Sequence, residues 1–550
     1  MEFGPVARTV PDLIREMAAS APDAKAIIPE SGQPLSYSDL AKLVEAGASG
    51  LRALGVGRGS TVAVMAPNIV EWVPAVVGAQ AAGAQVAAFN TFVKSYELTY
   101  LMEHSRAETL IVADRMGRHD LLEPLREALP ELWNSSTGQW KSQRFPHLRS
   151  VVVIGDQVPS GALSWAALIA TAAELPIAPE PQALADDVAV IVYTSGSTAR
   201  PKAVPLTHGG IIENGFNIGE RVGLTAADRV WLGSPLFWSF GVANALMATL
   251  SHGGALVLQA EYSAQAAADL ISREACTAAY LLPTITHGLL ALPAADREKL
   301  ASLRTGVTIG RPDEVRAAAV DLGVSEICNV YGATENYGNC CVTPHDMPLE
   351  QRLVCQGPPL PGVQIRIANT ASGAAPDAGE GELEVSGYLT TGYLGDPEQT
   401  KAAFTSDGWY RTGDSGRILP DGSFQFVTRA TDMIKTAGIN VSPAEVEDFI
   451  GGLPQVAEVV VVGTPDPIRG EVVVAFVRLA EGFESVGPRD LIALCKADVA
   501  SYKVPSRIVV VDQLPKTTTG KISRLELKQW AGAGTSESDV NPLQQVNSRA

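Results

Sequence analysis

The sequence predicts an α/β protein with a large N-terminal part and a smaller C-terminal part. In the first third of the chain, apolar runs typical of buried strands alternate with helical patterns, at residues 61–65, 70–83, 85–89, 97–104 and 109–113. A second α/β run covers residues 188–330, and short strands with Gly/Pro turns follow over residues 362–426. Alternation of this kind is typical of largely parallel sheets covered by helices.

The pattern changes near Arg429 to that of a compact α+β unit. Helices are expected at residues 443–450 and 489–500, and strands at residues 457–463, 472–479 and 507–512. A unit of about a hundred residues has an ordinary domain size. We therefore expect an N-terminal domain over residues 1–430, a C-terminal domain over residues 431–530 and a disordered tail over residues 531–550, which are polar and aperiodic.

Composition limits the class of protein. Of the 550 residues, 46% are hydrophobic and 19% are charged, which is typical of a soluble globular protein. The net charge of −18 argues against nucleic acid and anionic membranes as partners. Six cysteines without regular spacing argue against a disulfide framework. Residues 73–89 include Gln80 and Gln85 and are better suited to a buried helix than to a bilayer span. No signal peptide is recognised, so we expect a cytoplasmic protein.

A hydroxyl-rich loop follows the apolar strand predicted at residues 188–193. Residues 194–204 read T-S-G-S-T-A-R-P-K-A-V. Backbone N–H groups, Ser/Thr hydroxyls and the ammonium of Lys202 are suitable ligands for a polyphosphate. The G-x-x-x-x-G-K-[ST] spacing of a Walker loop is absent. Taken alone, the loop could equally be a polar surface turn.

Four further motifs follow the loop in the chain. They read Y-G-A-T-E at residues 331–335, W-Y-R-T-G-D at 409–414, R-A-T-D-M-I-K-T-A-G-I-N-V-S-P-A-E-V-E at 429–447 and L-P-K-T-T-T-G-K-I-S-R at 514–524. The five motifs, in this order, closely resemble the signatures of the adenylate-forming superfamily, which includes acyl-CoA synthetases, carrier-loading adenylation domains and beetle luciferases. The resemblance implies an N-terminal domain of two α/β subdomains plus a distorted β-barrel-like section, and a small, mobile α+β C-terminal domain.

The resemblance also implies a nucleotide site. It places Tyr331 against adenine and Asp414 on the ribose hydroxyls, and it places Glu335 on Mg²⁺, for which a carboxylate is a suitable ligand. The full set of nucleotide-binding residues implied in this way is Thr194, Ser195, Gly196, Ser197, Thr198, Lys202, Gly310, Arg311, Tyr331, Gly332, Thr334, Asp414 and Arg429.

Roles in catalysis and acyl binding follow from the same resemblance. Lys521 would stabilise charge beside the α-phosphate as the adenylate forms. Gly438 would let the thiol arm of coenzyme A pass, because it has no side chain. Thr431 occupies the hinge position. The acyl group is expected among residues 231–244, 281–286, 307–310 and 337–341, with substrate contacts from Phe237, Trp238, Tyr337 and Gly338.

The sequence departs from the family pattern at several positions. Ala199 and Ala203 replace glycines of the phosphate loop, and Arg311 replaces a small residue. Thr428 replaces a glycine, Thr431 a charged hinge residue, and Trp238 a frequent gating histidine. An alanine held at positive φ costs roughly 1 kcal/mol. Because Gly438 and Lys521 are kept, our hypothesis is that thioester formation is intact and adenylation from ATP is weakened.

The function implied is that of an acyl-CoA ligase. An apolar carboxylic acid and ATP would give an acyl-adenylate and pyrophosphate, with Mg²⁺, and coenzyme A would then give the thioester. One alternative is a half-reaction enzyme supplied with acyl-adenylate by an upstream adenylating enzyme. Another is an acyl-AMP ligase that loads a separate carrier protein. A non-catalytic adenylate-binding protein is disfavoured by Lys521. The acid, and whether the protein is a monomer or a homodimer, stay open.

Overall fold

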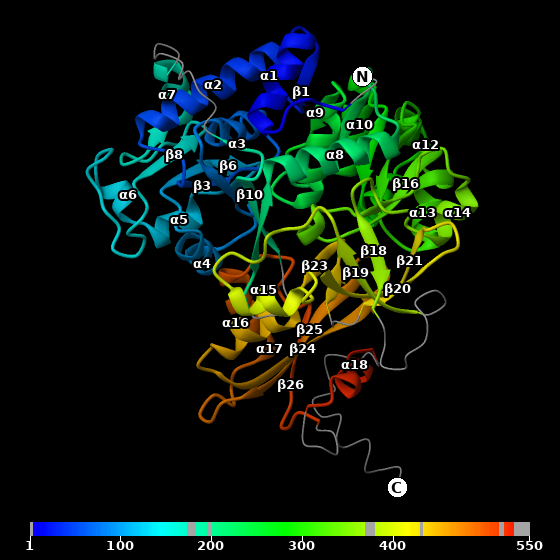
Figure 1. The fold of residues 1–550 in the computed structure, drawn as a ribbon. Helices are drawn as coiled ribbons and strands as arrows, with labels where there is room; N and C mark the ends of the chain where they lie inside the picture. Colours follow the sequence, from blue (N-terminus) through cyan, green and yellow to red (C-terminus); the bar gives the residue numbers. More distant parts are fainter. Residues whose placement is uncertain are drawn as a thin grey trace. The chain divides into compact units, whose positions relative to one another are not determined.

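The computed structural model describes residues 4–172, 183–194, 200–368, 380–429, 433–515 and 522–532. The chain forms two compact units, each described by itself below (Figure 1). The larger unit consists of Met1–Thr91, Leu98–Tyr193 and Ala203–Thr428, and the smaller one of Phe92–Glu97, Thr194–Lys202 and the chain from Arg429 onward.

A seven-stranded sheet is built mainly from the first third of the chain. In spatial order its strands are β11 (Lys202–Thr207), β10 (Val188–Thr194), β4 (Gln85–Ala88), β3 (Thr61–Met65), β5 (Thr109–Ala113), β8 (Ser150–Ile154) and β9 (Leu163–Ser164). From β10 to β9 each strand is parallel to the next. Every residue of β3 and β5 is buried, as in parallel strands covered on both faces. Both strands have the predicted bounds.

The helices of this region confirm the predicted alternation. They are α1 (Val10–Ser20), α2 (Tyr37–Ala53), α3 (Trp72–Ala81), α4 (Ser95–Ser105), α5 (Glu123–Ala128), α6 (Glu131–Asn134) and α7 (Trp165–Ala172), with a short ribbon of β6 (Arg115–Met116) and β7 (His119–Asp120). Ser36 caps α2 by accepting a hydrogen bond from the Asp39 N–H, which satisfies a donor that the first turn leaves free. All ten residues of α3 are buried, so it is a core helix.

An eight-stranded sheet forms the second α/β layer of the larger unit (Figure 1). Its order is β17 (Cys341–Val342), β16 (Glu326–Tyr331), β15 (Thr305–Thr308), β14 (Ala278–Leu281), β12 (Arg229–Leu232), β13 (Ala255–Leu258), β1 (Lys25–Pro29) and β2 (Leu35–Ser36). The six central strands are parallel, and the outer pairs β16–β17 and β1–β2 are antiparallel. One face, which includes Trp231, Leu281 and Ile327, forms a hydrophobic core with α10 and α11.

The connections of this sheet include α-, π- and 3₁₀-helical segments. The α-helices are α8 (His208–Val222), α9 (Met247–Ser251), α10 (Ala264–Glu274), α11 (Pro283–Leu290), α12 (Ala294–Arg297), α13 (Pro312–Arg316) and α14 (Leu349–Val354). Phe240–Leu246 and Ala317–Asp321 are π-helical, and Glu298–Leu300 and Thr334–Asn336 are 3₁₀ turns. π-Helical turns are rare and frequently lie at functional sites.

A four-stranded sheet completes the larger unit and confirms the predicted β-rich section. Its order is β18 (Gln364–Ile367), β19 (Gly381–Ser386), β20 (Tyr410–Ile418) and β21 (Phe424–Arg429), with α15 (Pro397–Ala403) between β19 and β20. β18, β19 and β20 are antiparallel neighbours. β20 begins within the W-Y-R-T-G-D motif and contains its residues Tyr410 to Asp414.

The C-terminal part of the chain is the predicted α+β unit. Its strands are β22 (Ile434–Thr436), β23 (Ile439–Val441), β24 (Val456–Asp466), β25 (Gly470–Leu479) and β26 (Arg507–Val510), and its helices are α16 (Pro443–Gly451), α17 (Pro488–Asp498) and α18 (Arg524–Gly532). The sheet order is β23-β22-β25-β24, with β26 parallel to β25. Two hydrophobic clusters, one including Val461 and Leu491 and the other Phe476 and Leu527, form its core.

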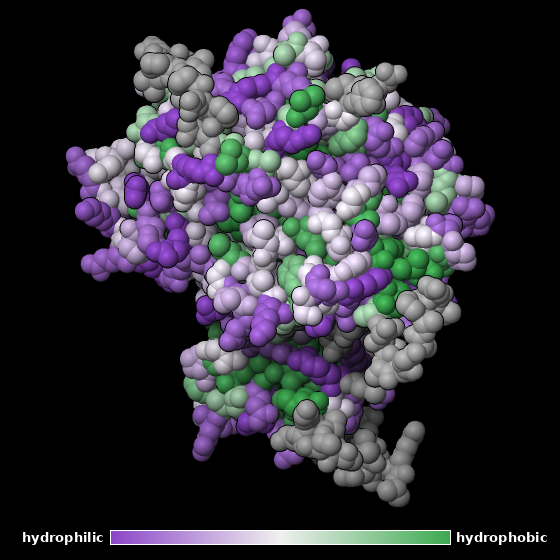
Figure 2. All heavy atoms as spheres, in the orientation of Figure 1, coloured by the Kyte–Doolittle hydropathy of each residue, from purple (hydrophilic) through white to green (hydrophobic). Residues whose placement is uncertain are grey.

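The surface and the cysteines agree with the composition. Hydrophilic residues cover much of the face in Figure 2, with hydrophobic residues in smaller areas between them. All six cysteines are buried free thiols, as the irregular spacing predicted. Among the residues that the structure describes, no helix is both long and apolar enough to cross a membrane.

Candidate active site

Residues 332–340, here termed the site loop, connect the antiparallel strands β16 and β17. The loop folds tightly because two glycines leave room for neighbouring atoms. A Cβ at Gly332 would lie 2.4 Å from the Gly338 carbonyl oxygen, and one at Gly338 would lie 2.6 Å from Asn244 Oδ1. Gly338 has a φ of +99°, a conformation that side chains disfavour. This loop carries Thr334 and Glu335.

Two of the predicted nucleotide contacts meet directly in the larger unit. Tyr331 ends β16, Asp414 lies in β20, and the Tyr331 hydroxyl donates a 2.7 Å hydrogen bond to Asp414 Oδ2. Both residues are buried. Burial raises the pKa of Tyr331 well above its usual value, and Asp414 raises it further. The phenol therefore stays protonated at neutral pH and orients the carboxylate. The motifs at residues 331–335 and 409–414 are brought together.

The predicted metal ligand, Glu335, also accepts a hydrogen bond from a phenol. The Tyr393 hydroxyl donates to Glu335 Oε1 at 2.7 Å, with only 7% of Tyr393 and 8% of Glu335 exposed. Burial, and then the Glu335 carboxylate, raise the pKa of Tyr393 above its usual value. A neutral donor holds the carboxylate in place without cancelling its charge. In the part of the chain that the structure describes, Glu335 forms no ion pair.

Two of the four predicted acyl contacts, Phe237 and Trp238, lie in a segment that touches the site loop, and the other two, Tyr337 and Gly338, belong to the loop. Ser239 Oγ lies 3.1 Å from Thr334 Oγ1, and Phe237 and Trp238 precede it. Phe237 is buried and Trp238 partly exposed, and their rings meet edge to face with centroids 5.8 Å apart. The segment leads into the π-helical turn Phe240–Leu246, so an irregular helix begins beside the site loop.

Tyr337, within the site loop, anchors the loop to α8 and to the π-helical turn Phe240–Leu246. Its hydroxyl lies 3.0 Å from Thr207 Oγ1 at the start of α8, and its carbonyl accepts a 2.8 Å hydrogen bond from Asn244 Nδ2. A Cβ at Gly210 would lie 2.3 Å from Tyr337 Cζ, so the glycine makes room for the ring. Tyr337 is 2% exposed. These contacts favour a role in holding the loop in addition to the predicted substrate contact.

Gly310 and Arg311 directly precede α13, and Arg311 is its N-cap residue. The Arg311 N–H donates a 2.7 Å hydrogen bond to Glu314 Oε2, and a Cβ at Gly310 would lie 2.2 Å from the same oxygen. The Arg311 side chain is 76% exposed and lies 3.5 Å from Asp313. Its guanidinium thus faces solvent and acidic neighbours, and the structure does not bring it into contact with Tyr331 or Asp414.

The phosphate loop lies between β10, which ends at Thr194, and β11, which begins at Lys202. Ser195, Gly196, Ser197, Thr198 and the departure Ala199 lie outside the described residues. Ala203 is buried in β11, where its carbonyl accepts a 3.0 Å hydrogen bond from the Leu394 N–H. The positive-φ residues other than glycine in the described chain are Arg106, Ala275, Tyr337 and Ala437. Ala203 therefore lacks the strain that we expected if its φ were positive.

In the smaller unit, Gly438 lies in the hairpin turn between β22 and β23. Thr436 pairs with Ile439, so Ala437 and Gly438 form a two-residue turn with φ of +52° and +82°. Positive φ at both positions is the geometry of a type I′ turn, for which glycine is favoured. Gly438 thus has a backbone role independent of thiol passage. Arg429 ends β21, and the predicted hinge Thr431 and catalytic Lys521 lie outside the described residues.

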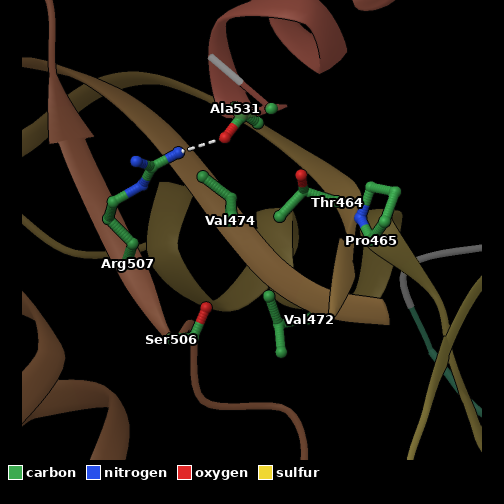
Figure 3. A pocket seen from close by; sticks show the side chains of 8 residues that line it. Thr464, Pro465, Val472, Val474, Ser506, Arg507 and Ala531 are labelled. Atoms are coloured by element: carbon green, nitrogen blue, oxygen red, sulfur yellow. Dashed lines mark hydrogen bonds between the residues drawn. The ribbon is translucent and has the colours of Figure 1, made fainter. Parts of the chain in front are cut away.

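A pocket of about 380 Å³ lies elsewhere in the smaller unit (Figure 3). Its lining consists of Thr464, Pro465, Val472, Val474, Ser506, Arg507, Ala531 and Gly532. Arg507 Nη2 already donates a 2.7 Å hydrogen bond to the Ala531 carbonyl. None of the residues predicted from the motifs lines this pocket, so it is separate from the candidate active site.

Sequence reasoning did not single out three residues of the site, although Ser239 and Asn244 lie in the range 231–244 that was expected to surround the acyl group. Tyr393 contacts Glu335, Ser239 contacts Thr334, and Asn244 fixes the Tyr337 carbonyl. Tyr393 follows Gly392 in a turn, and a buried tyrosine carries no signal in a sequence that separates it from an ordinary core aromatic. Ser239 could have been found from its position directly after Phe237 and Trp238.

Comparison with known families identifies the chain. The model of the AMP-binding enzyme family matches residues 14–394, and the model of the AMP-binding enzyme C-terminal domain matches residues 445–521. The chain belongs to the AMP-binding enzyme family. The resemblance to the adenylate-forming superfamily is thereby confirmed, and so is the predicted fold class of that superfamily.

Individual members of this family cover nearly the whole chain. The acyl-CoA synthetase homologue YngI of Bacillus subtilis is 32% identical, over 95% of this chain and 96% of its own. The mitochondrial medium-chain acyl-CoA ligase ACSF2 of Mus musculus is 31% identical, over 95% of this chain and 87% of its own. Among solved structures, the anthranilate CoA ligase AuaEII, in complex with anthranoyl-AMP, is 27% identical with a TM-score of 0.68, over 96% of this chain and 98% of its own.

Proposed function

We propose that this AMP-binding enzyme is an acyl-CoA ligase that acts through an acyl-adenylate. An apolar carboxylate would attack the α-phosphate of ATP to give acyl-AMP and pyrophosphate. The thiol of coenzyme A would then attack the acyl carbonyl, giving the thioester, AMP and a proton. Relatives named as acyl-CoA synthetases and ligases over nearly the full chain support this proposal, and so do the motifs in their order.

One observation carries the proposal. Tyr331, Glu335 and Asp414, predicted from two motifs about eighty residues apart, belong to one hydrogen-bonded region of the larger unit, in which each carboxylate accepts from a buried phenol at 2.7 Å. We propose that Asp414 binds the ribose hydroxyls, that the Tyr331 ring lies against adenine, and that Thr334 lies near the phosphates. Thr194 and Lys202, at the two ends of the phosphate loop, would provide further phosphate contacts.

The residues present fit a bound Mg²⁺. Among the described residues there is no cluster of three or more His, Cys, Asp or Glu side chains suited to a metal. Mg²⁺ in nucleotide sites needs only one or two carboxylates, because the substrate phosphates supply further oxygens. Glu335, whose Oε1 is held by Tyr393, is such a carboxylate. Bound there with the triphosphate, the ion would neutralise charge on the phosphates during transfer.

We propose the remaining roles from the family resemblance alone. Gly438 would border the path of the thiol, Lys521 would stabilise charge during adenylation, and Thr431 would be the hinge between a domain over residues 1–430 and one over residues 431–530. Phe237, Trp238, Tyr337 and Gly338 would contact the acyl group. Arg311, exposed beside Asp313, is the weakest of the proposed nucleotide contacts.

Weakened adenylation is the second candidate, and one observation counts against it. Its grounds were Ala199, Ala203 and Arg311. Ala203 lies in an extended strand, so the alanine carries no positive-φ penalty there. The hypothesis now depends on Ala199, which lies outside the described residues, and on the outward-facing Arg311. A half-reaction enzyme would need an upstream adenylating enzyme to supply its substrate.

A paired assay tests the proposal. Pyrophosphate release is measured with a panel of apolar carboxylic acids, and thioester formation from coenzyme A is measured with the synthetic acyl-adenylates of the same acids. We expect activity in both assays for the same acids. Thioester from adenylates without pyrophosphate release would establish the half-reaction enzyme. Pyrophosphate release without thioester would favour carrier loading, and inactivity in both assays across the panel would reject the ligase.

A further inference from the structure

Tyr393 is fixed against Glu335 from several sides. The Thr390 N–H donates a 2.7 Å hydrogen bond to the Glu335 carbonyl, and the Thr390 hydroxyl donates one of 2.7 Å to the Pro205 carbonyl. The Tyr393 N–H donates a 2.9 Å hydrogen bond to Thr400 Oγ1. The backbone around Tyr393 is therefore tied to the site loop, to β11 and to α15. A phenol with only two side-chain torsions then has little freedom in where its hydroxyl lies.

A second phenol supports the first. Tyr410 is buried, and its side chain hydrogen-bonds that of Tyr393. The single hydroxyl hydrogen of Tyr393 is donated to Glu335, so Tyr393 can only accept from Tyr410. The order of donation is thus Tyr410 to Tyr393 to Glu335. Both phenols are buried, so little water competes for these two hydrogen bonds.

The chemistry of this donor suits a metal ligand. An ammonium or guanidinium at the position of Tyr393 would orient Glu335 but would cancel the negative charge that a divalent cation needs. A phenol orients the carboxylate through Oε1 and leaves the charge. Groups that hydrogen-bond to a ligating side chain fix its orientation, and their loss typically weakens metal affinity about 10- to 100-fold.

We infer that Tyr393 is a positioning residue that holds Glu335 for the divalent cation of a metal–triphosphate complex. The inference rests on the proposed function, because the cation enters only with ATP. Tyr393 itself touches neither substrate nor metal. Its hydroxyl acts through Glu335, and Tyr410 acts through Tyr393.

The test is Tyr393→Phe, which removes only the hydroxyl. Binding of Mn²⁺–ATP is measured by electron paramagnetic resonance of the bound Mn²⁺, without any carboxylic acid. We expect the affinity to fall about tenfold, and the Mg²⁺ concentration that gives half-maximal pyrophosphate release to rise by a similar factor. Thioester formation from a synthetic acyl-adenylate, assayed in EDTA, should keep its wild-type rate because that step needs no divalent cation.

The chain offers a matched control. The Tyr388 hydroxyl donates to Glu213 Oε2, a phenol–carboxylate bond in the same unit that involves none of the predicted site residues. Tyr388→Phe should leave Mn²⁺–ATP binding and both half-reactions unchanged. In a Glu335→Gln background, Tyr393→Phe should have no further effect on Mn²⁺–ATP binding, because the hydroxyl acts only through that carboxylate.

Three results would overturn the inference. Unchanged Mn²⁺–ATP affinity in Tyr393→Phe would exclude the positioning role. Equal losses in the metal-independent thioester step and in pyrophosphate release would show a general structural role. A full effect of Tyr393→Phe in the Glu335→Gln background would show that the hydroxyl acts by another route. Failure of the proposed function is distinguishable, because the wild-type protein would then bind no Mn²⁺–ATP or release no pyrophosphate.

Discussion

Two glutamates from the recognised motifs, one in each unit, differ in the charge of their partners. Glu335 of the larger unit accepts a hydrogen bond from the neutral Tyr393. Glu447 of the smaller unit forms an ion pair with Arg524, in which both carboxylate oxygens contact Nη2, at 2.7 Å (Oε1) and 2.9 Å (Oε2). An acid that faces a cation is neutralised inside the protein, whereas one that faces a phenol keeps its charge for a ligand. The comparison separates a glutamate that is neutralised within the protein from one that we propose to bind a cation.

The surroundings of Glu447 show what it holds together. Arg524 Nη1 donates a 2.8 Å hydrogen bond to the Val461 carbonyl, and the Val461 N–H donates one of 2.7 Å back to Glu447 Oε1. The pair thus links α16, β24 and α18 within the smaller unit. Glu445 of the same motif likewise faces Lys503. We infer that the glutamates of this motif act on stability, and Glu335 on catalysis.

The largest expected effect comes from Glu335→Gln. Removal of the charge should lower kcat/KM for pyrophosphate release about 100-fold or more, because a neutral amide is a poor ligand for Mg²⁺. The amide oxygen can still accept from Tyr393, so the melting temperature should change little. The measurement is pyrophosphate release together with thermal unfolding. A folded variant with wild-type pyrophosphate release would contradict the assignment of Glu335 as the binding glutamate.

Arg524→Met should have the reverse effect: it should lower the stability of the smaller unit and leave pyrophosphate release little changed. Loss of the guanidinium leaves Glu447 with the Val461 N–H as its donor among the residues that the structure describes, and we expect a loss of about 2 kcal/mol of stability. The loss should be smaller than for a fully buried pair, because the side chains are 37% and 19% exposed. Chemical denaturation gives the loss, and hydrogen exchange in β24 and α18 locates it. The double variant Arg524→Met/Glu447→Leu should recover most of the stability. No recovery would mean that the pair does more than neutralise charge.

His208 extends the comparison to a buried base with a neutral partner. The Val10 N–H donates to His208 Nδ1, and burial lowers the pKa of His208 to about 4, although Asp187 and Asp12 oppose the shift. Between pH 6.5 and 4 the unfolded chain binds a proton that the folded chain does not, so stability falls as the pH falls, by at most about 1.4 kcal/mol per pH unit. Unfolding measured at pH 7 and pH 5 should show a smaller difference in His208→Asn. An unchanged difference would exclude His208 as the cause.

The sequence predicts some parts of this molecule in more detail than others. The strands β3 and β5 were predicted with their bounds, because continuous apolar runs can only be buried. Motif order predicted Tyr331 and Asp414 as nucleotide contacts. It did not predict the hydrogen bond between them, since the two residues are 83 positions apart and come from different sheets. The motifs did not predict that the Arg311 side chain points to solvent, where it lies beside Asp313. Tyr393 could not be recognised, because only the fold shows that its hydroxyl meets a carboxylate.

The smallest effect is expected in the hairpin of the smaller unit. It tests whether glycine is needed at position 438 for the turn alone or also for the passage of the thiol. With φ at +82°, Gly438→Ala should cost about 1 kcal/mol of stability by strain alone. Ala437→Gly, at φ +52° in the same turn, relieves strain and is the reciprocal control.

If Gly438 also borders the thiol path, Gly438→Ala should slow thioester formation from a synthetic acyl-adenylate and raise KM for coenzyme A, while pyrophosphate release keeps its wild-type rate. Ala437→Gly should change neither rate. A wild-type KM for coenzyme A in Gly438→Ala would restrict the glycine to the turn, and would place Gly438 with Glu447 among the residues of this unit that act on stability alone.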